Sequence, residues 1–189
     1  MNYTKFLLVF VFIIYNNEYL MDKIKFEDLL GKNISKAKEF TGRDFKSNAF
    51  KKKDFEVKFY SSRDYFKKDF FGMYYNQIII HTDNYEVIKS ITIYFDKLID
   101  REFYNSFNKE YGMPKHIQIV ENRRMESETL VKDDNGKVIE HLRKNTFDLR
   151  EGTFEEKPLY IIWEKENYEI KALLRQENMS QITFSVSAN

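Results

Sequence analysis

The chain has 189 residues, of which 42% are hydrophobic and 32% charged, a composition typical of a globular protein rather than a disordered one. Its 31 basic and 30 acidic residues leave a net charge of +1, which excludes a general electrostatic attraction to nucleic acid or to anionic membranes. The chain has no cysteine, which excludes disulfides, thiolate nucleophiles and cysteine metal sites.

The N-terminal segment predicts export. Lys5 precedes an apolar run, Phe6 to Tyr15, which has the length of a secretory signal core and is too short for an ordinary membrane span. We therefore expect a signal peptide over residues 1–18, a mature chain without a membrane span, and a location in the periplasm or cell envelope. No small-x-small cleavage site follows the run. The alternative is that Phe6 to Tyr15 forms a buried strand, in which case the protein is cytoplasmic.

Residues 19–189 are long enough for one well-buried domain. Its first predicted element is a short helix from Ile34 to Phe40, with Asn33 as its N-cap and Gly42 close to its C-terminal stop. The polar and basic stretch Arg43 to Lys53 that follows is predicted to be a loop.

The next stretch contains three predicted strands. Phe55 to Phe59 alternates apolar and charged residues, as a half-buried strand does. A connecting loop is predicted over Ser61 to Gly72. Tyr74 to His81 and Val87 to Phe95 are then predicted to pair as a hairpin. The second arm of this hairpin places three apolar residues on one buried face: Ile91, Ile93 and Phe95.

A second helix and a long hairpin come next. Asp100 can cap a helix whose apolar residues Phe103, Phe107 and Tyr111 recur at helical spacing and which Gly112 and Pro114 terminate. Another strand begins at Ile117. The highly charged region Met125 to Arg150 contains Asp134-Asn135-Gly136, the residues of a type I′ turn, so it is predicted to be a long, exposed hairpin.

The clearest structural pattern lies between Leu159 and Val186. Three runs of period-two alternation are separated by short polar turns, which predicts an antiparallel three-stranded meander with one buried face. Trp163, the only tryptophan, falls on the apolar side. The chain is therefore predicted to be an α+β protein, with an antiparallel sheet and two short helices arranged as two related helix-then-meander halves, about 24–97 and 98–189.

Two segments carry a family resemblance. Phe26 to Phe45 (FEDLLGKNISKAKEFTGRDF) and Phe103 to Pro114 (FYNSFNKEYGMP) resemble the short helix and glycine turn that open each unit of the tandem αβ repeats in β-lactamase-inhibitor-protein-like and small outer-membrane-assembly lipoprotein folds. The resemblance implies the architecture of most of the chain and no functional residues. The chain differs from the lipoproteins in lacking an N-terminal cysteine and from the inhibitors in lacking paired cysteines.

No motif in the sequence predicts catalysis, a cofactor or a metal. The three histidines, His81, His116 and His141, are isolated, and no His-x-His, His-x-x-x-His or Glu-x-x-His spacing occurs. Carboxylate pairs such as Asp133-Asp134 are interpreted as solvated charge. There is no phosphate-binding glycine loop and no nucleophile elbow.

Between Arg43 and Phe71, basic residues interleave with aromatic ones, a mixture that single-stranded nucleic-acid sites use. Acidic residues in the same segment cancel much of the charge, which disfavours nucleic acid as the partner. Aromatic loops on a sheet scaffold also suit protein recognition. We therefore assign partner binding to four residues of the predicted loop: Tyr65, Phe66, Phe70 and Phe71. The alternative is that these rings cover the sheet.

Together these observations predict a non-catalytic, exported or cell-envelope binding module that presents a sheet face or the aromatic loop to a protein partner, as an inhibitor or an assembly component. The alternative is a small ligand-binding domain or hydrolase whose polar groups converge between the helices and the sheet. A deep pocket with convergent His, Asp or Arg side chains would favour the alternative, whereas a shallow concave sheet would favour the binding module.

Overall fold

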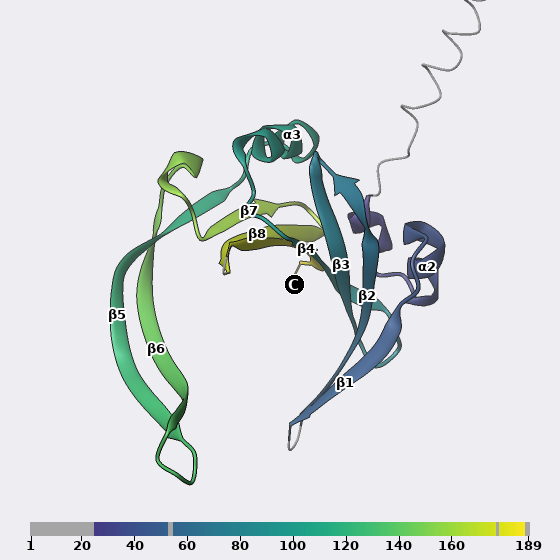
Figure 1. Ribbon diagram of the computed structural model, residues 1–189. Coiled ribbons are helices and arrows are strands. Elements are labelled where there is room, and N and C mark those ends of the chain that lie inside the picture. The colour runs from purple at the N-terminus through teal and green to yellow at the C-terminus, as the bar shows by residue number, and fades with distance from the viewer. Residues whose placement is uncertain (1–24, 53–54, 177, 188–189) are drawn as a thin grey trace, which may run out of the picture.

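A computed structural model of the chain describes residues 25–52, 55–176 and 178–187. Within them, nine strands form one antiparallel sheet in the order β1-β2-β3-β4-β9-β8-β7-β5-β6 (Figure 1). The strands are β1 (Lys46–Lys52), β2 (Phe55–Phe70), β3 (Met73–Thr82), β4 (Ile88–Phe95), β5 (His116–Lys132), β6 (Val138–Glu151), β7 (Tyr160–Glu164), β8 (Tyr168–Gln176) and β9 (Met179–Val186). The fold is therefore α+β with an antiparallel sheet, as predicted.

Both α-helices lie on one side of the sheet. They are α2 (Ser35–Thr41) and α3 (Arg101–Tyr111), and two single-turn 3-10 helices, η1 (Phe26–Leu29) and η2 (Phe154–Glu156), accompany them. Figure 1 shows the sheet bent into an arch, with α2 and α3 on its outer, convex side. The opposite, concave side of the sheet carries no described helix.

The core lies between the convex side of the sheet and the helices. Alternate residues of β4 and β9, such as Ile91, Ile93 and Phe184, are fully buried because successive side chains of a strand point to opposite faces. They meet Phe103 and Phe107 of α3 in one hydrophobic cluster. Aromatic rings dominate this cluster, so ring packing contributes much of the buried apolar surface that holds the helices on the sheet.

The helix ends agree with the predicted capping residues except at the start of α2, where the N-cap is Ile34, one residue after the predicted Asn33, and no side chain caps it. Asn33 Oδ1 accepts a hydrogen bond from Ser35 N (3.0 Å) at the start of α2, and Gly42 ends that helix in the left-handed conformation. Asp100 Oδ1 accepts from Phe103 N (2.9 Å) at the start of α3, and Gly112 ends it. Short polar side chains satisfy backbone N–H groups that a helix leaves unpaired at its start, which is why these positions could be predicted.

The predicted meander is confirmed as β7, β8 and β9, which pair in antiparallel register. Trp163 of β7 is 2% exposed, and its Nε1 donates to Asn108 Oδ1 and to the Gly112 carbonyl of α3, each at 3.1 Å. The tryptophan thus ties the meander to the second helix. The predicted hairpin of Tyr74 to His81 with Val87 to Phe95 is also confirmed, as β3 and β4.

Two predicted loops are wrong. The stretch Arg43 to Lys53 contains β1, and Ser61 to Gly72 is the second part of β2 followed by a turn at Phe71 and Gly72. The reason is that β1 is an edge strand and the register of β2 against β3 shifts between Arg63 and Lys68. A register shift or an edge position breaks the regular alternation by which strands are recognised in a sequence.

The long hairpin predicted over Met125 to Arg150 is confirmed and is longer than predicted, since β5 and β6 have 17 and 14 residues. It extends well beyond the end of β7 on one side of the arch (Figure 1). From Glu121 to Leu130 every residue of β5 is exposed, so this part of the hairpin stands free of the core.

The predicted signal peptide lies outside the described residues. Within them, no helix combines the length and the apolar character that crossing a bilayer requires.

One half-buried carboxylate is expected to make the stability depend on pH. Glu27 of η1 accepts a hydrogen bond from the Tyr111 hydroxyl of α3 (2.9 Å). Burial raises the pKa of Glu27, so the native state favours the protonated carboxyl. The stability that this group contributes is present below its unfolded pKa and is lost as pH rises through the raised, folded pKa.

We expect the stability of Glu27→Gln relative to the wild type to increase as the pH rises from about 4 to about 7, because glutamine keeps an oxygen acceptor and cannot ionise. Urea denaturation across this range measures the difference. Asp100→Asn is the control of opposite sign, because the hydrogen bond from Phe103 N lowers the pKa of Asp100. The loss of stability caused by Asp100→Asn should therefore grow as the pH rises. If the stability difference between Glu27→Gln and the wild type were the same at both ends of the pH range, the pKa of Glu27 would not be raised in the native state.

Candidate functional site

Two of the four predicted partner-binding residues, Phe70 and Phe71, are buried. Phe70, at the end of β2, is 3% exposed, and Phe71, in the turn after it, is 8% exposed. Both rings pack on Phe103 and Phe107 of α3. Tyr65 and Phe66 belong to β2, and their side chains lie outside the described part of the structure. Phe70 and Phe71 therefore belong to the core and are not available to a partner.

The concave side of three adjacent strands, β3, β4 and β9, carries a regular patch of nine residues. The register places Tyr94 between Gln77 and Gln181, Thr92 between Ile79 and Thr183, and Ser90 between His81 and Ser185. Their neighbours along each strand, such as Ile78, Ile93 and Ile182, are the buried core residues of the convex side. We call the nine residues the central patch: Gln77, Ile79, His81, Ser90, Thr92, Tyr94, Gln181, Thr183 and Ser185.

The central patch contains no Lys, Arg, Asp or Glu, although 32% of the chain is charged and roughly three charges would be expected among nine residues. Charged residues begin on the flanking strands, where Arg63 of β2 lies opposite Gln77, and Lys171 and Glu169 of β8 lie opposite Thr183 and Ser185. Depletion of charge at the centre, with a charged rim, is the arrangement of a protein-binding surface.

The side chains of the central patch are half-buried although no described helix covers them, and Thr92 at its middle is only 6% exposed. The Thr92 and Thr183 hydroxyls share a hydrogen bond of 2.9 Å across β4 and β9. Burial lowers the pKa of His81, which keeps its imidazole neutral at physiological pH. The patch is therefore uncharged, partly desolvated and internally ordered.

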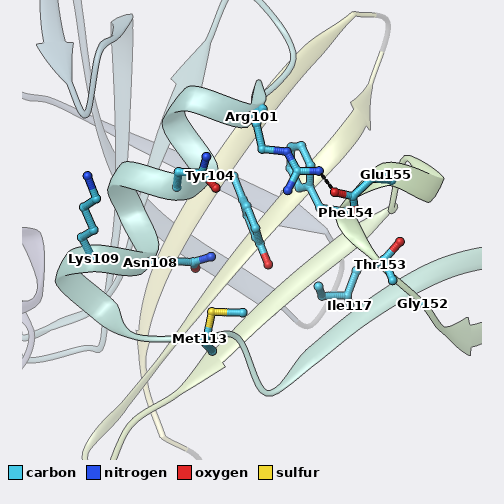
Figure 2. A pocket seen from close by; sticks show the side chains of 11 residues that line it. Arg101, Tyr104, Asn108, Lys109, Met113, Ile117, Gly152, Thr153, Phe154 and Glu155 are labelled. Atoms are coloured by element: carbon cyan, nitrogen blue, oxygen red, sulfur yellow. Dashed lines mark hydrogen bonds and ion pairs between the residues drawn. The ribbon is translucent and has the colours of Figure 1, made fainter.

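A second candidate is a groove of about 760 Å³ between α3 and the η2 segment (Figure 2). Tyr104 of α3 stacks on Phe154 of η2 with 4.4 Å between ring centroids, and the Arg101 guanidinium lies 4.6 Å from the Phe154 ring. Arg101 also forms an ion pair with Glu155. These contacts close one end of the groove. From there the groove continues along α3, where Asn105, Asn108, Lys109 and Met113 line it.

The groove has the volume of a small-molecule site but not the residues of a catalytic one. Its lining has no histidine or aspartate, its carboxylate Glu155 is paired with Arg101, and Asn108 Oδ1 already accepts a hydrogen bond from Trp163. A general base and a nucleophile would have to lie within hydrogen-bonding distance of each other. The lining residues provide no such pair.

Among the histidine side chains that the structure describes, only His116 contacts carboxylates. His116 Nδ1 lies 2.8 Å from Glu151 Oε1, and its Nε2 lies 4.0 Å from Glu164 Oε1. Glu164 is also paired with Lys115. Across the described residues, no group of three or more His, Asp or Glu side chains is arranged to hold a metal ion.

The central patch was not predicted from the sequence, because the strands were identified from the apolar residues of each alternating run. The polar residues of the same runs could have indicated the patch, since Gln181, Thr183 and Ser185 alternate with buried residues and none is charged.

Comparison with protein-family models, with curated proteins and with solved structures finds no match for this chain.

Proposed function

We propose that the protein is a non-catalytic binding module that recognises a protein partner through the concave side of its sheet, with the central patch at the middle of the interface. The observation that carries the proposal is the absence of charge from nine adjacent, half-buried positions of a highly charged chain. An uncharged surface of hydroxyl, amide and tyrosine side chains can be desolvated by a partner at low cost, because no ion has to leave water.

The shape of the sheet and the residues around the central patch also support a protein-binding surface. The sheet bends around the central patch (Figure 1), so a convex partner would contact several strands at once. Apolar side chains border the patch on both sides. Phe59 of β2 lies opposite His81, and Tyr160, Ile162 and Leu173 lie on the concave positions of β7 and β8. Lys171 lies 4.2 Å from the centroid of the Tyr160 ring, which fixes a charged group at the border of the surface. Charged groups at a rim give orientation and specificity rather than most of the affinity.

A ligand-binding role for the groove between α3 and η2 is the second candidate, favoured by its volume and by its aromatic end at Tyr104 and Phe154. We rank it below the central patch because its polar residues do not converge on one point and its arginine is already paired (Figure 2).

The proposal is tested with two matched amide-to-carboxylate changes. Gln181→Glu adds one charge to the central patch, and Asn105→Asp adds one charge to the groove. Immobilised wild type and both variants are used to capture proteins from an envelope extract of the native host, and the affinity of each captured protein is then measured. We expect Gln181→Glu to weaken binding by about 30-fold or more, because a buried, unpaired charge costs at least about 2 kcal/mol at an interface. Asn105→Asp should bind as the wild type does.

If Asn105→Asp lost binding and Gln181→Glu kept it, the groove and not the central patch would be the binding site. Retention of nothing by the wild type would contradict a protein-binding role. Unchanged thermal unfolding of both variants shows that a loss of binding is not a loss of fold.

We also infer that the module acts outside the cytoplasm, from the apolar run Phe6 to Tyr15, and that its two helix-then-meander halves are related. The order of elements supports the relation, since each half has a helix that ends at a glycine before its strands begin. The last strands of the two halves, β4 and β9, pair at the middle of the sheet. The resemblance to β-lactamase-inhibitor-protein-like folds agrees with this arrangement.

A further inference from the structure

The two edges of the sheet differ in how they are protected. β1 forms one edge and has three lysines among its seven residues. β6 forms the other and has large exposed hydrophobic side chains at five of its 14 positions: Val138, Ile139, Leu142, Phe147 and Leu149. Lysine on an edge strand discourages pairing with another chain, whereas a long edge with exposed apolar residues favours it.

β6 is also regular where its partner is not. Between Glu121 and Ser127, the extra residues of the β5–β6 ladder fall on β5. From Glu140 to Glu151, β6 contains no extra residue. Bulges on an edge strand twist it away from an incoming strand, and here they lie on the inner strand instead. The backbone of β6 is therefore an uninterrupted edge of twelve residues.

We propose that β6 pairs with β6 of a second copy of this chain, so that two sheets join into one across a two-fold axis. Such an axis makes the two strands antiparallel and keeps each side chain on its own face of the sheet. A residue at the centre of the contact then lies opposite its own copy, and the register is described by that residue.

Charge along β6 selects the register. Centred on Asn145, the pairing places Glu140 opposite Arg150 twice and no like charges opposite each other. Centred on Thr146, it places Lys144 opposite Asp148 twice, again without like charges. A centre at Lys144 would place that lysine opposite its own copy, and a centre at Phe147 would place Lys144 opposite Arg150. Like charges directly opposite are destabilising, and a centre at Arg143 also places that residue opposite its own copy. Among the registers that pair more than nine residues of β6, only the centres Asn145 and Thr146 therefore remain.

This inference does not depend on the proposed function. β6 is separated from the strands of the central patch by β5, β7 and β8, so a dimer formed through β6 leaves the central patch uncovered by the pairing itself. Failure of either idea would leave the other unaffected.

Sedimentation equilibrium on the full chain at concentrations up to about 100 µM tests the dimer. We expect a mass of twice 23.0 kDa for the wild type. The double variant with Leu142→Lys and Phe147→Lys should be monomeric with an unchanged circular dichroism spectrum, because both side chains are exposed. Tyr85→Lys, which changes another large side chain that is 84% exposed and lies away from β6, should remain dimeric. A monomeric wild type, or a dimer that survives the double change, would overturn the proposal.

Cysteine cross-linking identifies the contact itself, since the chain has no native cysteine. A residue opposite its own copy brings two Cβ atoms close to the separation that a disulfide needs. Under mild oxidation, we expect either Asn145→Cys or Thr146→Cys to give a covalent dimer, depending on the register. Asn48→Cys on β1 should stay uncross-linked. Absence of a covalent dimer from both β6 variants would contradict the pairing.

Discussion

Phe70→Ala should lower the free energy of unfolding by about 3–5 kcal/mol, the cost of removing a large ring from a packed core. The Phe70 ring is 3% exposed and has seven aromatic rings with centroids within 6.4 Å. These rings come from η1, β3, β4, α3, β9 and the turn after β2. Truncation therefore leaves a cavity at the point where η1 and α3 meet the sheet, and the surroundings cannot collapse into it without moving several elements.

Tyr74→Ala is the matched control, since Tyr74 lies four residues further along and is 57% exposed. Its effect should stay within about 0.5 kcal/mol, as for most surface substitutions. Urea denaturation gives both values. If the two variants lost similar stability, Phe70 would not lie in the core. The comparison also shows why Phe70 and Phe71 are unsuitable for testing partner binding, because their replacement would report unfolding.

Gly152→Ala should be destabilising by about 1–3 kcal/mol, the usual cost of overpacking. Gly152 follows β6, and its N–H donates to the Ile117 carbonyl at 2.9 Å. A Cβ atom at this position would overlap the Ile119 side chain and lie 2.9 Å from Glu156 Oε2. Glu156 cannot move away freely, because it accepts from Thr153 N (2.9 Å) and pairs with Arg150 (2.7 Å).

A second substitution checks the cause. Ile119→Ala removes the atoms that an added Cβ would meet, so Gly152→Ala should cost less in that background than in the wild type. We expect a favourable coupling of about 0.5–3 kcal/mol in a double-mutant cycle measured by urea denaturation. Strictly additive losses would mean that the alanine methyl group does not meet Ile119 and that another cause must be sought.

The strands and helices that could be predicted are those with a buried face or a capped end. The meander from Leu159 to Val186 was predicted because one face of it is fully buried, which forces apolar residues into every second position. The helix α3 was predicted because Asp100 and Gly112 mark its ends. β1 was missed because, as an edge strand rich in lysine, it has no such alternation.

Residues considered for the candidate site also differ in whether the sequence alone could place them. Local pattern alone identified Trp163 as a core residue, and the structure confirms it. It did not separate Phe70 and Phe71 from a surface loop, because a ring next to charged residues has the same sequence context on either side of a sheet. Burial of a ring depends on which helix packs above it, and here that helix is α3.

The sequence by itself determined the alternation within each strand, and with it which residues share a face, because side chains of a strand point to opposite sides in turn. Only the tertiary structure decided which strands that are distant in the sequence are neighbours. β4 and β9 pair across the middle of the sheet, and the hydrogen bond between Thr92 and Thr183 joins residues 91 positions apart. The central patch exists because three uncharged strand faces were brought together in this way, by contacts that no local pattern records.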